Sequence, residues 1–510
     1  MGRLSRSRWA LLILVIAVLL GVGYLRLREQ AVGAPVVTFL HFNDVYEIGA
    51  VAGGHSGGLA RVATVRAQLL KSTAHLITTL GGDYLSPSAI GTARVDGQPL
   101  AGRQMVDVLN ALGVDYATLG NHEFDVSESA FRQRTVESKF QLISTNVTDG
   151  HGKLFDGIGQ AIVVPVAPFR AATEDRYLQL GIIGLTIDSN RQPWVNYAPP
   201  IDAAKRAIAS FRAGPESAQV DAIIALTHLS LADDIALVNA VPDIDLVLGG
   251  HEHENWMIER GPHLTPIIKA DANVRSVAIV TMTFGVAGAR PTVTARLQVI
   301  DDTIAPDPKV DAAVKRWTTV AFDAFTRDGF TPGAAVATIT APLDGRESIV
   351  RNGSSALTDL ITASLVRETG PVDAAIFNSG SIRIDDVLTP GPITEYDVIR
   401  VLPFGGKVLK ATFDGALLAS VLDAGVANKG SGGYLQAAGI TRENNHWMVQ
   451  GKPLNPAARY TIAIDDFLLT GGEVNLGFLT RTNPHVHDIE ERRDIRQAMM
   501  AELRARSSSK

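Results

Sequence analysis

Short apolar segments recur along the first half of the chain, and several of them end directly in Asp, Asn, His or Gly. The segments with the composition of buried strands are Val36–Phe42, His75–Leu80, Tyr116–Leu119, Leu142–Val147, Leu178–Leu185, Ala222–Leu226 and Ile244–Leu248. Between the first two, apolar residues from Leu59 to Leu69 follow helical spacing. This alternation predicts an α/β layered domain, in which ligands bind beyond the carboxyl ends of the strands.

Five of the polar fragments carry residue types that bind metal ions. They are Asn43-Asp44, Gly81-Gly82-Asp83, Gly120-Asn121-His122-Glu123-Phe124-Asp125, Thr227-His228, and Gly249-Gly250-His251-Glu252-His253. Aspartate supplies an oxygen that can bridge two cations, asparagine a neutral oxygen, and histidine a nitrogen suited to zinc, manganese or iron. The adjacent glycines let backbone and substrate approach closely. One such fragment is usually an ordinary loop, but five in one domain predict a dinuclear metal centre.

Composition narrows the possible partners. The 510 residues suffice for two or three domains, and a hydrophobic fraction of 46% is ordinary for a chain with a large core. A net charge of -6 gives no broad basic field, so a nucleic-acid polymer is a poor candidate partner. A small phosphorylated ligand is still compatible, because a metal pair attracts anions locally. The absence of cysteine excludes cysteine nucleophiles, thiolate metal sites and disulfides.

The N-terminus carries an export pattern. Arginines within the first eight residues precede an apolar run, Trp9–Leu25, and Arg26 follows it. The run is longer than a signal-peptide core of about 7–15 residues and close to the ~17-residue minimum of a spanning helix. Residues 1–34 are therefore predicted to be a signal anchor in the membrane, with a cleaved signal peptide as the alternative because Val32-Gly33-Ala34 is a weak cleavage pattern. Either interpretation places the rest of the chain outside the cytoplasm.

A second region follows Asp301. Pro308–Phe325 has the apolar spacing of a connecting helix, and Gly329–Ala334 is typical of a loop. A mixed α/β segment is predicted from about Thr331 to the end of the chain. Its charged tail, Ile489–Arg506, has a thin apolar stripe and is predicted to be a surface helix.

The five fragments resemble, in their order, the motifs of the calcineurin-like metallophosphoesterases. From about Val36 to about Phe478 the chain resembles the 5′-nucleotidase and UDP-sugar hydrolase family. The resemblance implies an α/β (α+β layered) fold. Residues 35–305 would form a four-layer metallophosphoesterase β-sandwich flanked by helices, and residues 306–332 a connecting helix or linker. Residues 333–510 would form a smaller, mixed α/β domain that binds the substrate.

The resemblance also implies a role for each matching residue. The implied metal ligands are Asp83 as the bridge, Asp44 and His253 at the first metal ion, and Asn121, His228 and His251 at the second. His122 would stabilise charge on the phosphoryl oxygens, and Asp125 would orient its imidazole. Two cations about 3.5–4 Å apart clamp phosphoryl oxygens and activate a water for in-line attack on phosphorus.

One departure from the family lies at the centre of this set. Many relatives have Asp-x-His in the first fragment, and here the third position is Tyr46. A phenol with a reference pKa near 10 is a poor ligand unless a metal ionises it. Three hypotheses remain open: Tyr46 binds as a phenolate, water fills the position, or the first site is weak. A phenolate would suit iron better than zinc, so zinc, manganese and iron all remain open.

The C-terminal region resembles the domain that binds the nucleoside in this family. Asn378 and Arg383 lie in an Asn-x-Gly-x-x-Arg segment, and Gly391–Thr394 and Val401–Phe404 resemble the signature strand and turn. Both residues would then reach the substrate, Arg383 with a planar fork suited to phosphate or ribose oxygens. Arg351 lies in the stretch that opens this domain and is a further candidate for substrate binding.

The expected pocket for the base is altered. Tyr434 matches the place where relatives put a ring against the base, a contact worth about 1–3 kcal/mol. The second ring expected in Gly-Gly-Asp-Gly-Phe/Tyr is replaced by Asn475, and Phe478 is out of register. The acidic and amide residues expected near Ser354 and Ala356 are absent. A half-buried packing role for Tyr434 is therefore the alternative.

These features predict an exported, metal-dependent phosphoester hydrolase, a 5′-nucleotidase that releases phosphate from nucleoside 5′-monophosphates by attack of a metal-bound hydroxide. Alternatives with the same core are a 2′,3′-cyclic-nucleotide phosphodiesterase with 3′-nucleotidase activity and a UDP-sugar hydrolase. A third alternative, a catalytically weakened cell-surface binding protein, is supported only by Tyr46 and the altered base pocket. The expected partners are a small nucleotide or phosphoester and, through the N-terminal segment, a membrane.

Overall fold

The computed structural model describes residues 35–170, 175–213, 220–285 and 289–508. The signal or anchor predicted within residues 1–34 lies outside these ranges. Among the described residues, no helix has the length and apolar character needed to cross a bilayer.

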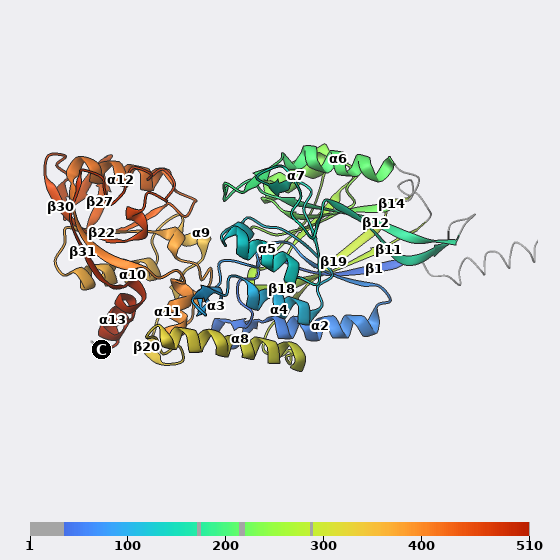
Figure 1. The fold of residues 1–510 in the computed structure, drawn as a ribbon, viewed down its shortest axis with the longest axis horizontal. Coiled ribbons are helices and arrows are strands. Elements are labelled where there is room, and N and C mark those ends of the chain that lie inside the picture. Colours follow the sequence, from blue (N-terminus) through green and yellow to red (C-terminus); the bar gives the residue numbers. More distant parts are fainter. Residues whose placement is uncertain (1–34, 171–174, 214–219, 286–288, 509–510) are drawn as a thin grey trace, which may run out of the picture.

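Two β-sheets packed face to face form the larger half of the molecule (Figure 1). The first sheet has the order β10 (Ile158–Gly159), β8 (Gln141–Ile143), β7 (Tyr116–Thr118), β4 (Leu76–Leu80), β1 (Val36–Phe42), β18 (Ser276–Thr283) and β19 (Thr292–Val299). The second has the order β11 (Ala161–Arg170), β12 (Asp175–Thr186), β14 (Val220–His228), β15 (Leu246–Gly249), β17 (Thr265–Lys269) and β16 (Trp256–Arg260). Apolar side chains such as Phe39 and Ile224 fill the space between them.

Helices cover the outer face of each sheet. On the first sheet they are α2 (Leu59–Ser72), α4 (Arg103–Leu112), α5 (Glu128–Glu137) and α8 (Pro308–Arg327), and on the second α6 (Pro200–Arg212) and α7 (Leu231–Ala240). Each helix buries its apolar side against a sheet, as Val62 of α2 and Ile208 of α6 do. This is the predicted four-layer sandwich, and the neighbouring strands β1, β4, β7, β8 and β10 run parallel.

One predicted strand was too long. The apolar run Leu142–Val147 was expected to be continuous, but β8 ends at Ile143 and β9 (Val147–Asp149) pairs with β13 (Val195–Tyr197) in a separate ribbon. The residues between them are held by the other sheet. Asn146 donates to the carbonyl of Thr186 and accepts from its N–H, both at 2.8 Å.

The smaller half of the molecule is built on a mixed sheet. Its order is β26 (Leu435–Ala438), β22 (Ala374–Asn378), β30 (Arg459–Asp465), β25 (Lys407–Asp414) and β31 (Val486–Asp494). Helices α10 (Ala356–Thr369) and α13 (Ile495–Ser508) pack together on one side, and α12 (Gly415–Ala427) covers the other. Short elements at the junction include α9 (Glu347–Val350), β24 (Gly391–Thr394) and α11 (Glu395–Val401).

The charged tail of the chain corrects a prediction. Ile489–Arg506 was expected to be one surface helix, but its first part belongs to β31 and the helix α13 begins at Ile495. The strand forms because it pairs with β25 at the edge of the sheet, where exposed charged side chains such as Asp488, Glu490 and Arg493 are interspersed with half-buried ones. The helix is also less superficial than expected, since Met499 and Leu503 are buried.

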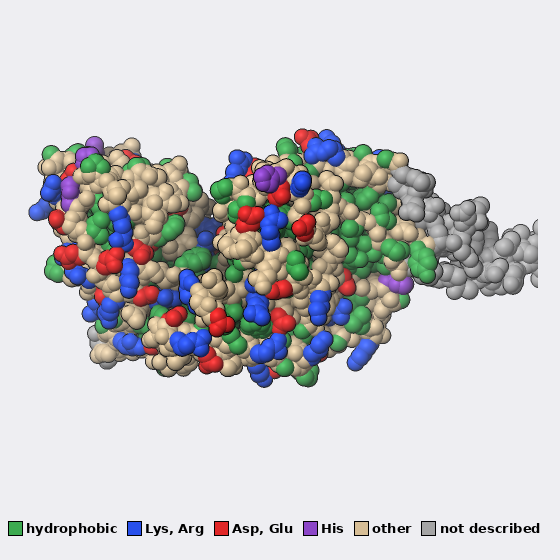
Figure 2. All heavy atoms as spheres, viewed as in Figure 1, with side chains coloured by type: hydrophobic (Ala, Val, Ile, Leu, Met, Phe, Trp, Pro, Cys, Tyr) green, Lys and Arg blue, Asp and Glu red, His purple; other side chains and the backbone are tan. Residues whose placement is uncertain are grey.

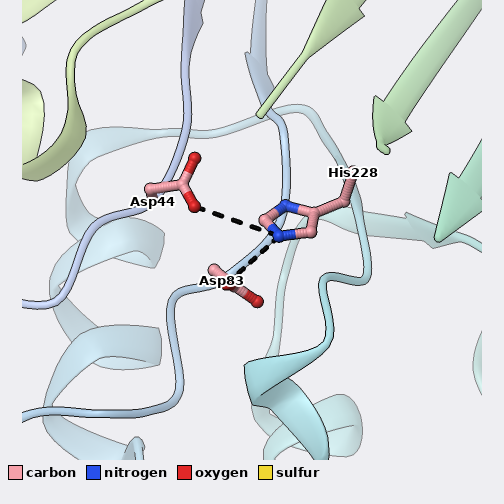
Figure 3. A group of neighbouring side chains, drawn as sticks. All are labelled: Asp44, Asp83 and His228. Atoms are coloured by element: carbon pink, nitrogen blue, oxygen red, sulfur yellow. Dashed lines mark ion pairs between the residues drawn. The ribbon is translucent and has the colours of Figure 1, made fainter. Parts of the chain in front are cut away.

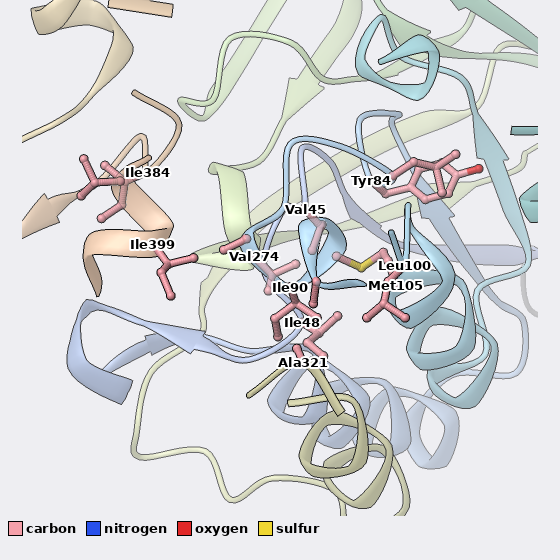
Figure 4. Close-up of a cluster of buried hydrophobic side chains, with 14 of the residues drawn as sticks. Val45, Ile48, Tyr84, Ile90, Leu100, Met105, Val274, Ala321, Ile384 and Ile399 are labelled. Atoms are coloured by element: carbon pink, nitrogen blue, oxygen red, sulfur yellow. The ribbon is translucent and has the colours of Figure 1, made fainter. Parts of the chain in front are cut away.

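The two halves share one apolar core. The predicted connecting helix is confirmed as α8, which extends to Arg327 and packs on the larger half. Val45, Ile48 and Val274 from the larger half belong to the same buried cluster as Ile384 and Ile399 from the smaller half (Figure 4). On the face in Figure 2, acidic and basic side chains are interspersed over both halves, and the surface is notched between them.

Asp465 at the end of β30 makes stability depend on pH. The residue is buried, and its Oδ1 has no hydrogen-bond partner among the described residues. Burial, with the nearby Asp466 charge, raises the pKa of Asp465 from 3.8 to about 8. The folded protein therefore keeps a proton that the unfolded chain releases. The free energy of unfolding should fall as pH rises from about 4 to about 8, by at most about 1.4 kcal/mol per pH unit.

Asp465→Asn is expected to remove this penalty, because the amide carries no charge at either pH. Thermal unfolding should show the variant to be more stable than the wild-type protein at pH 8, and the difference should shrink steadily as pH falls toward 4. Glu443→Gln, at an exposed position in β27 (Ile440–Glu443), is the control for surface charge. Equal pH dependence in wild type and Asp465→Asn would contradict the assignment.

Candidate metal centre

The carboxyl ends of strands from both sheets meet at one edge of the sandwich, where His41 of β1 hydrogen-bonds through Nε2 to the carbonyl of Gly249 at 3.0 Å. All predicted metal ligands lie at strand ends: Asp44 after β1, Asp83 after β4, Asn121 after β7, His228 at the end of β14, and His251 and His253 after β15. Among the described residues, Asp44, Asp83 and His228 have ligand atoms within 4.8 Å of one another, and Figure 3 shows these side chains pointing toward one another.

Asp83 occupies the middle of this set. Its Oδ2 is 3.1 Å from His228 Nε2, and its Oδ1 accepts a hydrogen bond of 2.8 Å from the N–H of His122. Asp44 Oδ1 lies 3.9 Å from the same His228 atom and 3.4 Å from His253 Nε2. The Asp83 carboxylate thus lies against a ligand of the predicted second subsite with one oxygen and against the main chain of His122 with the other.

Four of the predicted ligand residues have strained backbones. Asp44, Asp83, His251 and His253 have φ values of 53°, 55°, 87° and 61°, in the left-handed region that costs a non-glycine residue about 1–3 kcal/mol. Such strain persists where the surroundings impose it, and it clusters at functional sites. Glycine is required next to these residues because neighbouring atoms approach its Cα closely. A Cβ on Gly120 would stand 2.1 Å from Asp83 Oδ1.

One predicted ligand has an unsatisfied atom. Asn121 Oδ1 is buried and has no hydrogen-bond partner among the described residues. His228 Nε2 is buried as well and lies 3.1 Å from Asp83 Oδ2. A buried polar atom without a partner costs about 1–3 kcal/mol, which coordination of a cation would recover. With the two carboxylates, these atoms form an oxygen and nitrogen donor set suited to a divalent transition metal. The residues at this site therefore fit a metal ion.

Protonated histidine balances the carboxylates at this site. Burial opposes ionisation, but the Asp83 and Asp44 carboxylates outweigh it and raise the pKa of His228 to about 9. Burial, together with the His228 charge, lowers the pKa of His251 to about 3. A metal ion would replace the proton on His228, because only the neutral ring can ligate.

Tyr46 lies inside the predicted first subsite. Its hydroxyl is 3.2 Å from Asp44 Oδ1, 3.2 Å from Asp83 Oδ2 and 2.8 Å from His253 Nε2. Burial and the two aspartates raise the pKa of Tyr46 well above its usual value, so only a bound cation would ionise the phenol. The oxygen is close enough to these ligands to join them, and all three hypotheses for Tyr46 stay open.

His122 and Asp125 form the predicted pair. The carboxylate of Asp125 lies 2.7 Å from His122 Nδ1 and also accepts from Ser86 Oγ at 3.0 Å and Asn190 Nδ2 at 2.6 Å. Burial alone would lower the pKa of His122, but Asp125 and Asp83 outweigh it and raise that pKa. The held imidazole beside Asp83 can donate a proton or a hydrogen bond at neutral pH.

Two buried charged residues beside the ligands were not predicted. Glu123 accepts backbone hydrogen bonds from Asp83 at 2.9 Å and Tyr84 at 2.7 Å, so it fixes the loop that carries Asp83. Lys269 donates to the carbonyls of Leu229 and Gly250, both at 2.7 Å, and thereby ties the loops after His228 and before His251. Glu123 could have been suspected from its place in the third fragment. Lys269 lies at the end of the apolar strand β17, and no sequence motif around it indicates a functional role.

The smaller half places Arg383 near the predicted catalytic pair. The positive charge of Arg383 is close enough to act on the pKa values of both His122 and Asp125. Its guanidinium lies over the ring of Phe404 at 5.6 Å, and its Nε is buried without a hydrogen-bond partner in the described part of the chain. Arg351 lies close by and pairs with Glu347, whose Oε1 is 3.9 Å from Arg383 Nη1.

The other predicted substrate residues lie together at the ends of the neighbouring strands β22 and β26, with Asn378 the last residue of β22 and Tyr434 directly before β26. The N–H of Ser379, which follows Asn378, donates to the carbonyl of Tyr434 at 2.9 Å. Asn378 donates to Glu473 at 2.7 Å, so Glu473, which the sequence did not single out, belongs to this group. Tyr434 is half-buried, as the packing alternative also requires. Asn475 instead contacts Asn428 at 2.7 Å.

Comparisons with known proteins agree on both halves. The family described as calcineurin-like phosphoesterase matches residues 37–255, and the 5′-nucleotidase C-terminal domain matches residues 335–479. Protein UshA of Yersinia enterocolitica is 24% identical over 528 residues, covering 87% of this chain and 89% of that protein. Snake venom 5′-nucleotidase of Naja atra is 24% identical over 505 residues, covering 86% and 91%.

Solved structures show the same fold. A 5′-nucleotidase precursor from Thermus thermophilus superposes with a TM-score of 0.73 at 22% identity, covering 93% of this chain and 97% of that one. The sulfate thiohydrolase SoxB from Thermus thermophilus gives 0.69 at 16% identity, covering 92% and 94%. Because proteins with different printed activities share the fold, the fold alone does not select the substrate.

Proposed function

Because the chain belongs to the 5′-nucleotidase family, in which a calcineurin-like phosphoesterase domain precedes a 5′-nucleotidase C-terminal domain, we propose that it releases phosphate from nucleoside 5′-monophosphates. The protein is a metallophosphoesterase that hydrolyses ester bonds. The observation that supports the choice of substrate class is the match of residues 335–479, which include Asn378, Arg383 and Tyr434, to the 5′-nucleotidase C-terminal domain.

Two divalent ions are part of this proposal. Asp83 would hold both, Asp44 and His253 the first, and the predicted second set, Asn121, His228 and His251, the other. Such a pair polarises phosphoryl oxygens and provides a nucleophile at neutral pH. Zinc, manganese and iron all suit the oxygen and nitrogen donors, and a phenolate from Tyr46 would favour iron.

Residues other than the proposed metal ligands would stabilise the transition state and bind the nucleoside. Asp125 holds the proton of His122 on Nδ1, which leaves Nε2 free to face the phosphoryl group. Protonated His122 would stabilise the charge that develops on the phosphoryl oxygens, and Arg383 of the smaller half would add a second positive charge. Asn378 and Tyr434 would contact the nucleoside, with the ring of Tyr434 against the base. Arg351, which pairs with Glu347, is a further proposed substrate-binding residue.

The division of the chain is proposed as predicted. Residues 35–305 would be the phosphoesterase domain, 306–332 the connection through α8, and 333–510 the substrate domain. We propose that residues 1–34 direct export and either remain as a membrane anchor or are cleaved, which would place the site in the periplasm or the extracellular space.

The test is a panel of substrates offered to the chain expressed from Val36 with manganese, zinc or iron. AMP, 2′,3′-cyclic AMP, UDP-glucose and p-nitrophenyl phosphate are compared by phosphate release. The proposal expects kcat/KM for AMP to exceed that for p-nitrophenyl phosphate by about 10-fold or more, because Arg383, Asn378 and Tyr434 would bind the nucleoside. A preference for the cyclic nucleotide or UDP-glucose would select an alternative enzyme. Release from none of them would favour a binding protein.

A further inference from the structure

A proposed metal ligand is held by a residue of the other domain. His253 turns Nε2 toward Asp44 Oδ1 at 3.4 Å, and its other nitrogen, Nδ1, lies 2.6 Å from Asp385 Oδ2. His253 follows β15 in the phosphoesterase domain, whereas Asp385 belongs to the loop before β23 (Val387–Leu388) in the nucleotidase domain. The contact therefore crosses the domain boundary at the predicted first subsite.

The carboxylate of Asp385 is fixed within its own domain. The N–H of Glu347, at the start of α9, donates to Asp385 Oδ1 at 2.7 Å, so both oxygens have partners. Asp385 is mostly buried and has a φ of 37°, a backbone conformation that ordinary side chains rarely adopt. Asp385 thus has a strained backbone and a buried carboxylate. One carboxylate oxygen is bound within its own domain, and the other contacts a proposed ligand histidine, which is the geometry of a positioning residue.

Apolar packing and an ion pair join the two domains close to this contact. Ile384, the neighbour of Asp385, is buried in the apolar cluster that also contains Val274 (Figure 4). Arg400 Nε donates to Glu47 Oε1 at 3.3 Å across the same boundary, with both side chains largely buried. These contacts hold Asp385 at a set distance from His253.

We propose that Asp385 positions His253 for the first metal ion, so that the nucleotidase domain completes the metal site of the phosphoesterase domain. The inference rests on the proposed two-metal function. A carboxylate that accepts from Nδ1–H fixes the tautomer, leaves the Nε2 lone pair free for the metal and raises the basicity of the ring. Because Tyr46 replaces one imidazole at this subsite, His253 is the only histidine predicted there, and its orientation has a large influence on affinity.

The test compares Asp385→Asn with wild type in the chain from Val36, both domains present. Equilibrium dialysis against a series of free Mn²⁺ concentrations, with metal measured by mass spectrometry, gives the number and strength of the sites. We expect two sites in wild type, and one of them weakened about 10–100-fold in the variant. Asp359→Asn is the matched control, because it removes an exposed aspartate charge from α10 in the same half of the molecule.

Activity adds a readout that loss of structure would not give. Excess Mn²⁺ should restore phosphate release by Asp385→Asn toward the wild-type kcat, whereas a misfolded protein would not recover. If wild type bound no metal, the proposed function itself would fail. If wild type bound two ions and turned over AMP while Asp385→Asn bound both equally well, or lost both equally, only the role of Asp385 would be overturned.

Discussion

His122→Ala is expected to lower kcat for phosphate release from AMP by about 10²–10⁴-fold while the bound metal is unchanged. The imidazole is held by Asp125 at 2.7 Å beside Asp83, but it is not among the proposed metal ligands. Removing it takes away a positive charge next to the phosphoryl oxygens and leaves the rest of the site intact. Steady-state kinetics and metal content of the same preparation measure both quantities.

A matched control is available for this variant. His263→Ala removes an exposed histidine outside the described site and should leave both quantities unchanged. Asp125→Asn should give a smaller loss than His122→Ala, since the ring remains but its tautomer is no longer fixed. Turnover by His122→Ala equal to that of wild type would remove His122 from the catalytic assignment.

Asp83→Asn is expected to reduce bound metal from two ions to one or none and to lower kcat/KM by about 10³-fold or more. A neutral amide cannot bridge two cations, and the loss of several kcal/mol of charge stabilisation corresponds to that factor. Asparagine tolerates the φ of 55° at this position, so the backbone is not further strained. Metal analysis after dialysis and AMP kinetics test the expectation.

The number of metal ions that Asp83→Asn loses shows whether Asp83 bridges two ions or binds only one. Asp44→Asn should weaken mainly the first subsite, because Asp44 lies 3.4 Å from His253 Nε2. If Asp83→Asn lost only one ion and behaved as Asp44→Asn does, a bridging role would be wrong. Circular dichroism of both variants checks that the fold is retained.

Local sequence patterns predicted the parts of this molecule that local chemistry determines. Strand ends that carry Asp44, Asp83 and His228 were visible because parallel strands place their carboxyl ends at one edge, and the structure brings those side chains together. The break after Ile143 and the strand from Val486 were missed. Both depend on partners elsewhere in the chain, the Asn146–Thr186 contact and the pairing with β25.

Local sequence patterns also did not predict the residues that act on the site through other residues. Glu123 and Lys269 are buried ionisable residues with partners on the backbone of distant loops, and Lys269 also pairs with the side chains of Asp234 and Glu252. Asp385 stands 132 positions from His253 in sequence, and nothing near it indicates a metal. Such contacts follow from how the domains dock, which sequence spacing does not encode.

The apolar cluster that joins Ile48 and Val274 to Ile399 has a consequence for how the protein can be divided. An interface between domains is usually polar and lets each half exist alone, but this one is continuous with the interior of both. A fragment that stopped near residue 305 would lose the cover over Val274 and expose a patch prone to aggregation. The two halves are therefore expected to melt as one cooperative unit, and a protease that cut the loop after α8 would release neither as a free, soluble domain.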